Sequence, residues 1–144
     1  MNAPRIGVVH SRFNAEISDA LLESARVEAA RLGAQAEYVA VAGALEIPLA
    51  LQWLAQSGRF DALAAIGAVI RGDTYHFEIV CNESARGVMD VALQFGLPVA
   101  NGILTTEDEA QALARKDKGA EAVRVAIEMA RLKRELAEKM GTKG

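Results

Sequence analysis

Apolar residues along this chain gather in two alternating kinds of segment. Short uninterrupted runs are typical of strands buried on both faces of a parallel sheet, and residues 62–70 are the clearest example. Longer segments with apolar residues three and four positions apart are typical of helices that bury one face. The runs predict strands at 6–10, 37–42, 62–70 and 97–104. The periodic segments predict helices at 19–32, 48–56, 77–95, 106–115 and 120–140.

Residues that start and stop helices support these boundaries. Ser18 is the predicted N-cap of the first helix, and Gly33 suits the position just after its end. Pro48 fits the first turn of the second helix. Residues 106–109 are predicted to form a capping box for the short fourth helix, and Gly96 ends the third.

The alternation of strands and helices predicts the architecture. Such a chain forms right-handed crossovers and a parallel sheet covered by helices on both faces. A length of 144 residues is that of one domain with a core of its own. We therefore expect residues 1–144 to form a single α/β domain, a three-layer α/β/α sandwich around a four-stranded parallel sheet.

The last predicted helix carries two apolar stripes. The first stripe is Val123, Ala126, Ile127 and Ala130. The second is Val125, Met129, Leu132, Leu136 and Met140. One stripe can cover the sheet, whereas the second needs a partner, and another subunit is the expected one. The alternative is that both stripes merge into one broad buried face.

Composition and charge narrow the class of protein. Apolar residues make up 51% and charged residues 24% of the chain, which is ordinary for a globular protein. A net charge of −3 gives no reason to expect a nucleic-acid partner. No apolar segment approaches the roughly 20 residues that cross a membrane, and no signal peptide is recognisable. We expect a cytoplasmic protein without a membrane partner.

Cysteine and histidine are too few for a standard zinc site. The apolar stripe of the third helix is Phe77, Cys81, Ala85, Val88, Ala92 and Phe95. Cys81, the single cysteine, falls on this stripe, so a buried structural thiol is expected. One cysteine and two histidines cannot alone supply four zinc ligands. The sequence therefore predicts no metal site.

The candidate chemistry lies in the turns that follow the first three strands, at residues 11–14, 43–46 and 71–76. In a parallel sheet these turns meet at the carboxyl edge, where open α/β sheets bind ligands. The third turn, Arg-Gly-Asp-Thr-Tyr-His, leads into a helix whose N-terminus favours anions. Dinucleotide, P-loop and nucleophile-elbow motifs are missing from the sequence.

Three side chains in these turns have both a chemical and a bland interpretation. Phe13 can stack on a flat heterocycle, or it packs within its loop. Glu46 can accept hydrogen bonds from hydroxyl or ring N–H groups, or it is a charge favoured at a helix start. His76 lies at the positive end of a helix dipole, which favours a neutral, proton-accepting ring, or it is an ordinary surface histidine.

Five segments, in order and over nearly the whole chain, resemble those of the 6,7-dimethyl-8-ribityllumazine synthase family of riboflavin biosynthesis. They are RFN at 12–14, GALEIP at 43–48, VIRGDTYHFE at 69–78, CNESARG at 81–87 and GILTTE at 102–107. The resemblance implies a flavodoxin-like fold. It implies a cofactor-free transferase that condenses 5-amino-6-ribitylaminouracil with 3,4-dihydroxy-2-butanone 4-phosphate and releases phosphate and water.

The resemblance also implies roles for individual residues. Phe13 would stack on the pyrimidine, backbone at 68–70 would contact the uracil edge, and His76 and Arg115 would be catalytic. The substrate-binding residues that it implies are Phe13, Ala44, Leu45, Glu46, Ala68, Val69, Ile70, Gly72, Asp73, Thr74, Asn101 and Lys118. Among these, Gly72, Asp73 and Thr74 would present the phosphate site. Asn101, in the turn of the fourth strand, stands where many members have Phe. Either the site lacks an aromatic wall against the pyrimidine there, or Asn101 supplies a polar contact instead.

In this family the active sites lie between adjacent subunits, so the resemblance implies at least a pentamer. Arg115 and Lys118 would then enter the site from the neighbouring subunit. A riboflavin synthase partner is left open. The competing hypothesis is a non-catalytic flavin- or pterin-binding module, or a cage-forming assembly subunit, on the same scaffold.

Overall fold

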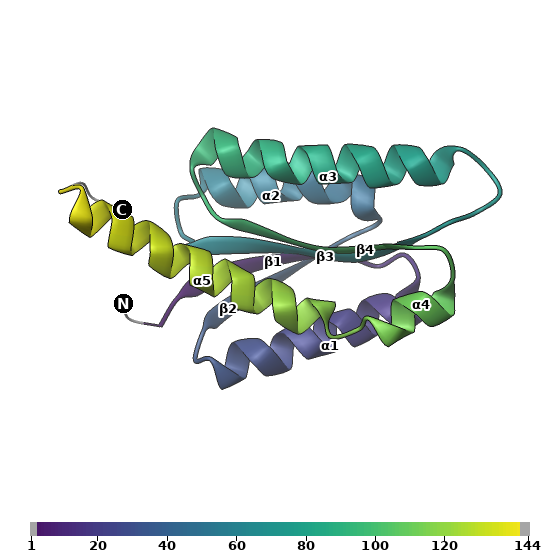
Figure 1. The fold of residues 1–144 in the computed structure, drawn as a ribbon, viewed down its shortest axis with the longest axis horizontal. Helices are drawn as coiled ribbons and strands as arrows, with labels where there is room; N and C mark the ends of the chain where they lie inside the picture. The colour runs from purple at the N-terminus through teal and green to yellow at the C-terminus, as the bar shows by residue number, and fades with distance from the viewer. Residues whose placement is uncertain (1–2, 142–144) are drawn as a thin grey trace.

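The computed structural model describes residues 3–141, which fold around one four-stranded sheet (Figure 1). In chain order the elements are β1 (Arg5–Ser11), α1 (Ala15–Arg31), β2 (Gln35–Val41), the short 3-10 helix η1 (Ala44–Glu46), α2 (Ile47–Gln56), β3 (Ala62–Ile70), α3 (His76–Phe95), β4 (Val99–Thr106), α4 (Glu109–Ala114) and α5 (Lys118–Lys139). The strand order is β2-β1-β3-β4, and all neighbours are parallel. The predicted fold class is confirmed.

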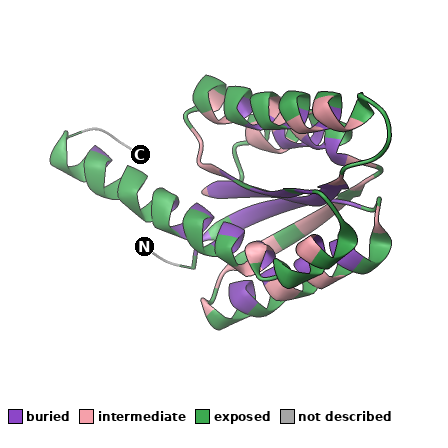
Figure 2. Cartoon of the chain, turned by 45° about the vertical axis from the view of Figure 1, so that its right-hand side comes forward, coloured by how far each residue is buried: buried purple, intermediate pink, exposed green. Residues whose placement is uncertain are grey.

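Helices cover both faces of this sheet. The helices α2 and α3 lie on one face, and α1, α4 and α5 lie on the other (Figure 1). The central strand β3 is buried along its whole length except at Ile70, whereas the edge strand β2 has no buried residue. In Figure 2 the buried strands are purple, and one strand is pink and green. A strand with helices on both faces has no side that could carry polar residues, which explains the uninterrupted apolar run. Two apolar cores result, one on each face of the sheet.

The predicted start of α1 is wrong. The helix begins at Ala15, four residues before the predicted start, and Ser18 is buried inside its first turns. The Ser18 hydroxyl donates a hydrogen bond to the carbonyl of Phe13 at 2.7 Å and does not cap the helix. The N-cap position belongs to Asn14, whose φ of 58° is left-handed. Asparagine adopts this conformation more readily than most residues, so the helix can begin directly at the turn.

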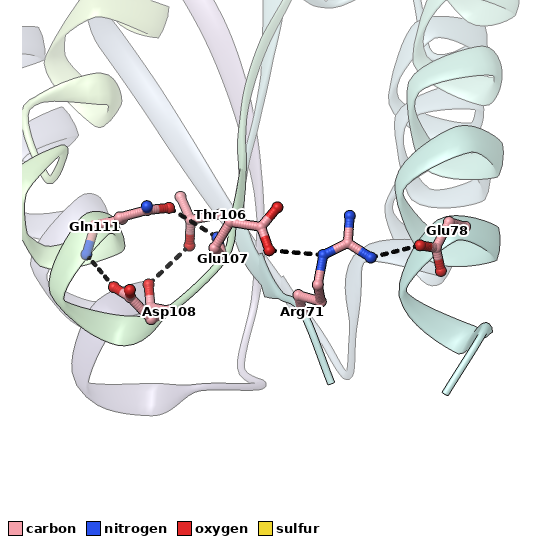
Figure 3. Close-up of polar contacts among 6 residues, drawn as sticks. All are labelled: Arg71, Glu78, Thr106, Glu107, Asp108 and Gln111. Carbon is pink, nitrogen blue, oxygen red and sulfur yellow. Dashed lines mark hydrogen bonds and ion pairs between the residues drawn. The ribbon is translucent and has the colours of Figure 1, made fainter. Parts of the chain in front are cut away.

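The predicted capping box of α4 is shifted by two residues. Strand β4 continues to Thr106, and the N-cap is Asp108, whose carboxylate accepts a hydrogen bond from the backbone N–H of Gln111 at 2.8 Å. The Gln111 side chain in turn accepts from the backbone N–H of Glu107 at 2.8 Å (Figure 3). The same reciprocal logic applies, with Asp108 and Gln111 in place of the predicted Thr106 and Glu109.

The buried face of α3 is rotated relative to the prediction. Ala85, on the predicted stripe, is exposed, and Cys81 is only half-buried. The buried residues of this helix are Val80, Ser84, Val88 and Val91. Burial nevertheless raises the pKa of the Cys81 thiol, so it stays protonated and unreactive at neutral pH.

The two stripes of α5 have different surroundings. The first stripe is buried against the sheet. The second stays exposed, from 38% at Val125 to 71% at Met140. It lines a groove of about 570 Å³, the helix groove, together with Met89, Leu93 and the start of β4. In the single chain, the alternative of one merged buried face is wrong.

Close contact between α1 and α5 fixes the position of the last helix. A Cβ atom on Gly119 would lie 2.0 Å from the carbonyl oxygen of Leu21, so only glycine fits there. Further along, the buried carboxylate of Glu28 accepts hydrogen bonds from Arg31 and from Arg124 of α5. These two hydrogen bonds, Arg31 first, lower the pKa of Glu28 to about 2.

None of the helices between residues 3 and 141 combines the length and the hydropathy that crossing a membrane requires.

Candidate active site

The turn after β1 is held against both neighbouring strands. The backbone N–H groups of Arg12 and Phe13 donate to the carbonyls of Val41 and Ala42, at 2.9 and 3.1 Å. The amide side chain of Asn14 donates to the carbonyl of Ala68 at the end of β3, at 3.1 Å. These bonds leave the Phe13 ring 70% exposed, at the rim of the carboxyl edge of the sheet.

The turn after β2 brings a carboxylate to the same edge. It passes through Gly43 into η1 and then directly into α2, whose first turn contains Pro48 as predicted. A Cβ atom on Gly43 would lie 3.2 Å from Oε1 of Glu46, so the carboxylate folds back over this glycine. Ala44 is buried beneath the turn, whereas Leu45 and Glu46 are exposed.

The turn after β3 is the most open of the three. Residues 71–76 are all exposed, and a Cβ atom on Gly72 would meet no heavy atom within 4 Å. The α3 helix begins at His76, one residue before the predicted start, so the histidine lies at the positive end of the helix as predicted. The hydroxyl of Thr74 accepts a long hydrogen bond of 3.4 Å from the backbone N–H of His76.

The three turns enclose one cavity of about 410 Å³, the edge cavity. The predicted residues that line it are Phe13, Ala44, Leu45, Glu46, Ala68, Val69, Ile70, Gly72, Thr74 and His76. Asp73 belongs to the same turn but does not line the cavity. The edge cavity lies next to the junction of β1 and β3, where the strand order reverses. Open α/β sheets bind ligands at such a position.

Sequence reasoning missed part of the cavity wall. Ala42, Gly43, Phe77 and Val80 also line it. Phe77 was assigned to the core stripe of α3, and the residue is indeed half-buried against the apolar core. A ring in the first turn of a helix that begins at a ligand-binding edge is the signal that could have identified it.

Besides Asp73, three of the predicted residues lie outside this cavity. The Arg115 guanidinium donates to the carbonyl of Gln111 at 2.9 Å, and the Lys118 ammonium pairs with Glu121 at 3.1 Å. Asn101 is the third residue of β4, so the prediction that it lies in a turn is wrong. Its side chain accepts a hydrogen bond from the backbone N–H of Ile103 at 2.9 Å.

Arg71 is the cation of the turn after β3, but it does not line the cavity. Its guanidinium lies between two carboxylates (Figure 3). Its Nε atom donates to Glu107 at 2.7 Å, and its Nη1 atom donates to Glu78 at 2.6 Å. The hydrogen bond from Arg71 lowers the pKa of Glu78, and the two carboxylates, Glu78 first, raise the pKa of Arg71. This guanidinium is therefore occupied by protein carboxylates.

No cluster of three or more His, Cys, Asp or Glu side chains suited to a metal ion occurs among the residues that the structure describes.

Fold and cavity together define a class: an α/β protein with a small-molecule site at the carboxyl edge of its parallel sheet, built from an aromatic ring, a carboxylate and a helix start. Comparison with known proteins identifies the family. The profile of 6,7-dimethyl-8-ribityllumazine synthase matches residues 3–134. The chain belongs to this family.

Several curated relatives carry the same name. The protein of Nitrosomonas europaea is 60% identical over 131 residues, which are 88% of this chain and 80% of that protein. The protein of Paraburkholderia phymatum is 58% identical over 132 residues, which are 89% of this chain and 77% of that protein. The protein of Burkholderia vietnamiensis is 57% identical, with 89% and 78% of the two chains covered.

Proposed function

We propose that this chain uses the edge cavity to condense 5-amino-6-ribitylaminouracil with 3,4-dihydroxy-2-butanone 4-phosphate. The product is 6,7-dimethyl-8-ribityllumazine, an intermediate of riboflavin biosynthesis, and phosphate and water are released. The protein is a transferase of the lumazine synthase family. The observation that carries the proposal is that one cavity gathers Phe13, Glu46 and His76 around a helix start.

The pyrimidine substrate fits the side of the cavity formed by the first two turns. The exposed face of Phe13 is available to stack on its flat ring. In this proposal the backbone groups of residues 68–70, which line the cavity, pair with the uracil edge. Glu46, with Ala44 and Leu45 beside it in the cavity lining, accepts hydrogen bonds from the ribityl hydroxyls.

The phosphate-bearing substrate fits the opposite side, at the start of α3. This helix has 20 residues, and the positive end of its dipole and its free N–H groups favour an anion there. In this proposal the backbone of Gly72 and Asp73 and the hydroxyl of Thr74 contact the phosphate. His76, the next cavity residue, moves protons as the amine adds to the ketone and water leaves.

We further propose that the site is completed by a neighbouring subunit in a ring of at least five copies. Arg115, Lys118 and Asn101 lie outside the cavity of their own chain, so they can act only on a cavity of another copy. The exposed second stripe of α5 supports association independently, since a large apolar surface is rarely left in water. A head-to-tail ring repeats one contact and creates equivalent sites between neighbours.

Mixed rings test this shared site. Chains with His76→Ala and chains with Arg115→Ala should each be inactive, but co-expression should restore part of the activity. Some interfaces in the mixed rings then pair an intact His76 with an intact Arg115. Mixed rings that demonstrably form and remain inactive would contradict the shared site.

Three further statements from the sequence remain predictions. Residues 1–144 are proposed to act as one domain, which limited proteolysis would test. A cytoplasmic location can be checked by fractionating the producing cells. A riboflavin synthase partner can be checked by co-purification from the same cells.

One assay tests the activity itself. The two substrates are mixed with the purified protein, and the fluorescence of the lumazine and the release of phosphate are followed together. Both signals should appear in equal amounts and should depend on protein concentration. Binding of the pyrimidine without either signal would contradict the proposal and favour a non-catalytic binding module.

A further inference from the structure

Arg71 joins three segments at the carboxyl edge of the sheet. Its backbone N–H donates to the carbonyl of Thr106 at 2.9 Å, one residue beyond the last paired position of β3 and β4. Its side chain bridges Glu107, in the turn after β4, and Glu78, in the first turn of α3 (Figure 3). One residue therefore connects β3, the β4–α4 turn and the start of α3.

The same guanidinium also covers a wall of the edge cavity. Its Cζ atom lies 4.5 Å from the centroid of the Phe77 ring, which is a stacking distance. Phe77 lines the cavity and follows His76 directly, but Arg71 itself does not line the cavity. Arg71 thus contacts the residue beside the candidate proton carrier, and it does so from outside the site.

The turn between these contacts has few restraints of its own. The described side-chain hydrogen bond inside residues 72–76 is the long one between Thr74 and His76. The residues of this turn are exposed, so packing does not order them either. The conformation of the turn must therefore be set from its two ends, and the ion pair of Arg71 with Glu78 closes those ends on each other.

We propose that Arg71 is a positioning residue that holds the turn 72–74 and His76 in the geometry that the reaction needs. This inference rests on the function proposed for that turn. Exposed ion pairs contribute little to stability, so the expected effect falls on the site more than on folding. Lysine is a poor replacement, because one ammonium cannot reproduce two directed hydrogen bonds and a planar stack.

The test compares Arg71→Gln and Arg71→Lys with a matched control, Arg86→Gln. Arg86 is also exposed and also bridges two carboxylates, those of Glu83 and Asp90 at 2.7 and 3.0 Å. All three residues of this control bridge lie on α3, so its loss separates no elements. The measurements are kcat, the KM of each substrate and the inhibition constant of inorganic phosphate.

Arg71→Gln should raise the KM of the phosphate-bearing substrate by about tenfold to 10²-fold and should weaken phosphate inhibition in parallel, because a displaced turn misplaces its ligand groups. The KM of the pyrimidine should stay within about twofold, since the groups proposed to hold it come from the first two turns and from residues 68–70 of β3, which stay fixed by their pairing with β4. Arg71→Lys should fall in between, and Arg86→Gln should match the unmodified protein. Equal changes in both KM values, or kinetics like those of Arg86→Gln, would overturn the inference.

Hydrogen exchange separates this inference from the proposed function, because it needs no turnover. The amides of Glu78 and Ile79 donate to the carbonyl of Tyr75 at the end of the turn. They should exchange faster in Arg71→Gln, and their exchange should be unchanged in Arg86→Gln. An unmodified protein that forms no lumazine would refute the proposed function, while unchanged exchange in an active protein would refute the positioning role. If Arg71→Gln does not fold, Glu107→Gln can replace it, because this variant removes one of the two ion pairs of Arg71. It should show the same rise in KM and the same faster exchange, both smaller, and the absence of both changes would overturn the inference.

Discussion

Replacing Phe13 by alanine separates a binding role from a packing role. The ring is 70% exposed, so roughly a third of its surface is covered by the protein. Full burial of a phenylalanine contributes about 1.5–3 kcal/mol, so the variant should lose only about 0.5–1 kcal/mol of unfolding free energy. Stacking between an aromatic side chain and a base contributes about 1–3 kcal/mol. Pyrimidine affinity should therefore fall by roughly fivefold to 150-fold.

Two measurements and one control decide the outcome for Phe13. Urea unfolding gives the stability, and titration with an unreactive pyrimidine analogue gives the affinity. Phe13→Leu keeps most of the apolar contact but has no ring, so it should fold like the unmodified protein and bind as poorly as Phe13→Ala. Unchanged affinity in both variants would refute stacking. A loss of stability above about 2 kcal/mol would instead identify Phe13 as a packing residue of its loop.

Three other predictions concern proton transfer, acid stability and helix packing. His76→Ala should slow turnover by about 10²-fold, a usual loss for a general acid–base group, and single-turnover kinetics showing an unchanged chemical step would contradict the role. The pKa of Glu28 is about 2 in the folded protein and about 4.5 without its partners. The carboxylate therefore stabilises the fold above pH 4.5, and this contribution is lost as the pH falls towards 2. The stability deficit of Glu28→Gln, measured by urea unfolding, should shrink over that range, and a constant deficit would argue against this linkage. Gly119→Ala should destabilise the protein by about 1–3 kcal/mol or more, because the new methyl group meets the backbone of Leu21, and a neutral result would show that α5 can shift freely.

The positions of the strands and the three-layer arrangement could be predicted from local sequence patterns. The run at residues 62–70 is bounded by polar residues and has no polar position to place on an outer face, so its boundaries match β3 without error. The turn after β3 could be predicted equally well, because a buried strand followed by glycine and short polar residues is typical of a strand, a turn and a helix start. The same features predicted that Thr74 and His76 lie at the edge of the sheet that carries the cavity.

Contacts between distant segments could not be predicted in this way. The start of α1 depends on Asn14, whose side chain donates a hydrogen bond to the carbonyl of Ala68, a residue that lies 54 positions further along the chain. Arg71 donates to Glu107, which lies 36 positions further along. Local patterns also cannot predict that Arg115 lies outside the cavity of its own chain, because its position depends on how α4 packs against β4.

The helix groove has a chemical consequence because of what lines it. Three of the four methionines in the chain, Met89, Met129 and Met140, line this groove and are between 44% and 71% exposed in the single chain. Peroxide converts exposed thioethers to polar sulfoxides, which cannot be accommodated in an apolar contact. If the proposed rings cover the groove, oxidation of unassembled chains would prevent their later association, whereas assembled rings would protect the same sulfur atoms. The fraction of chains without methionine oxidation after a peroxide pulse would therefore measure the fraction that had assembled before the pulse.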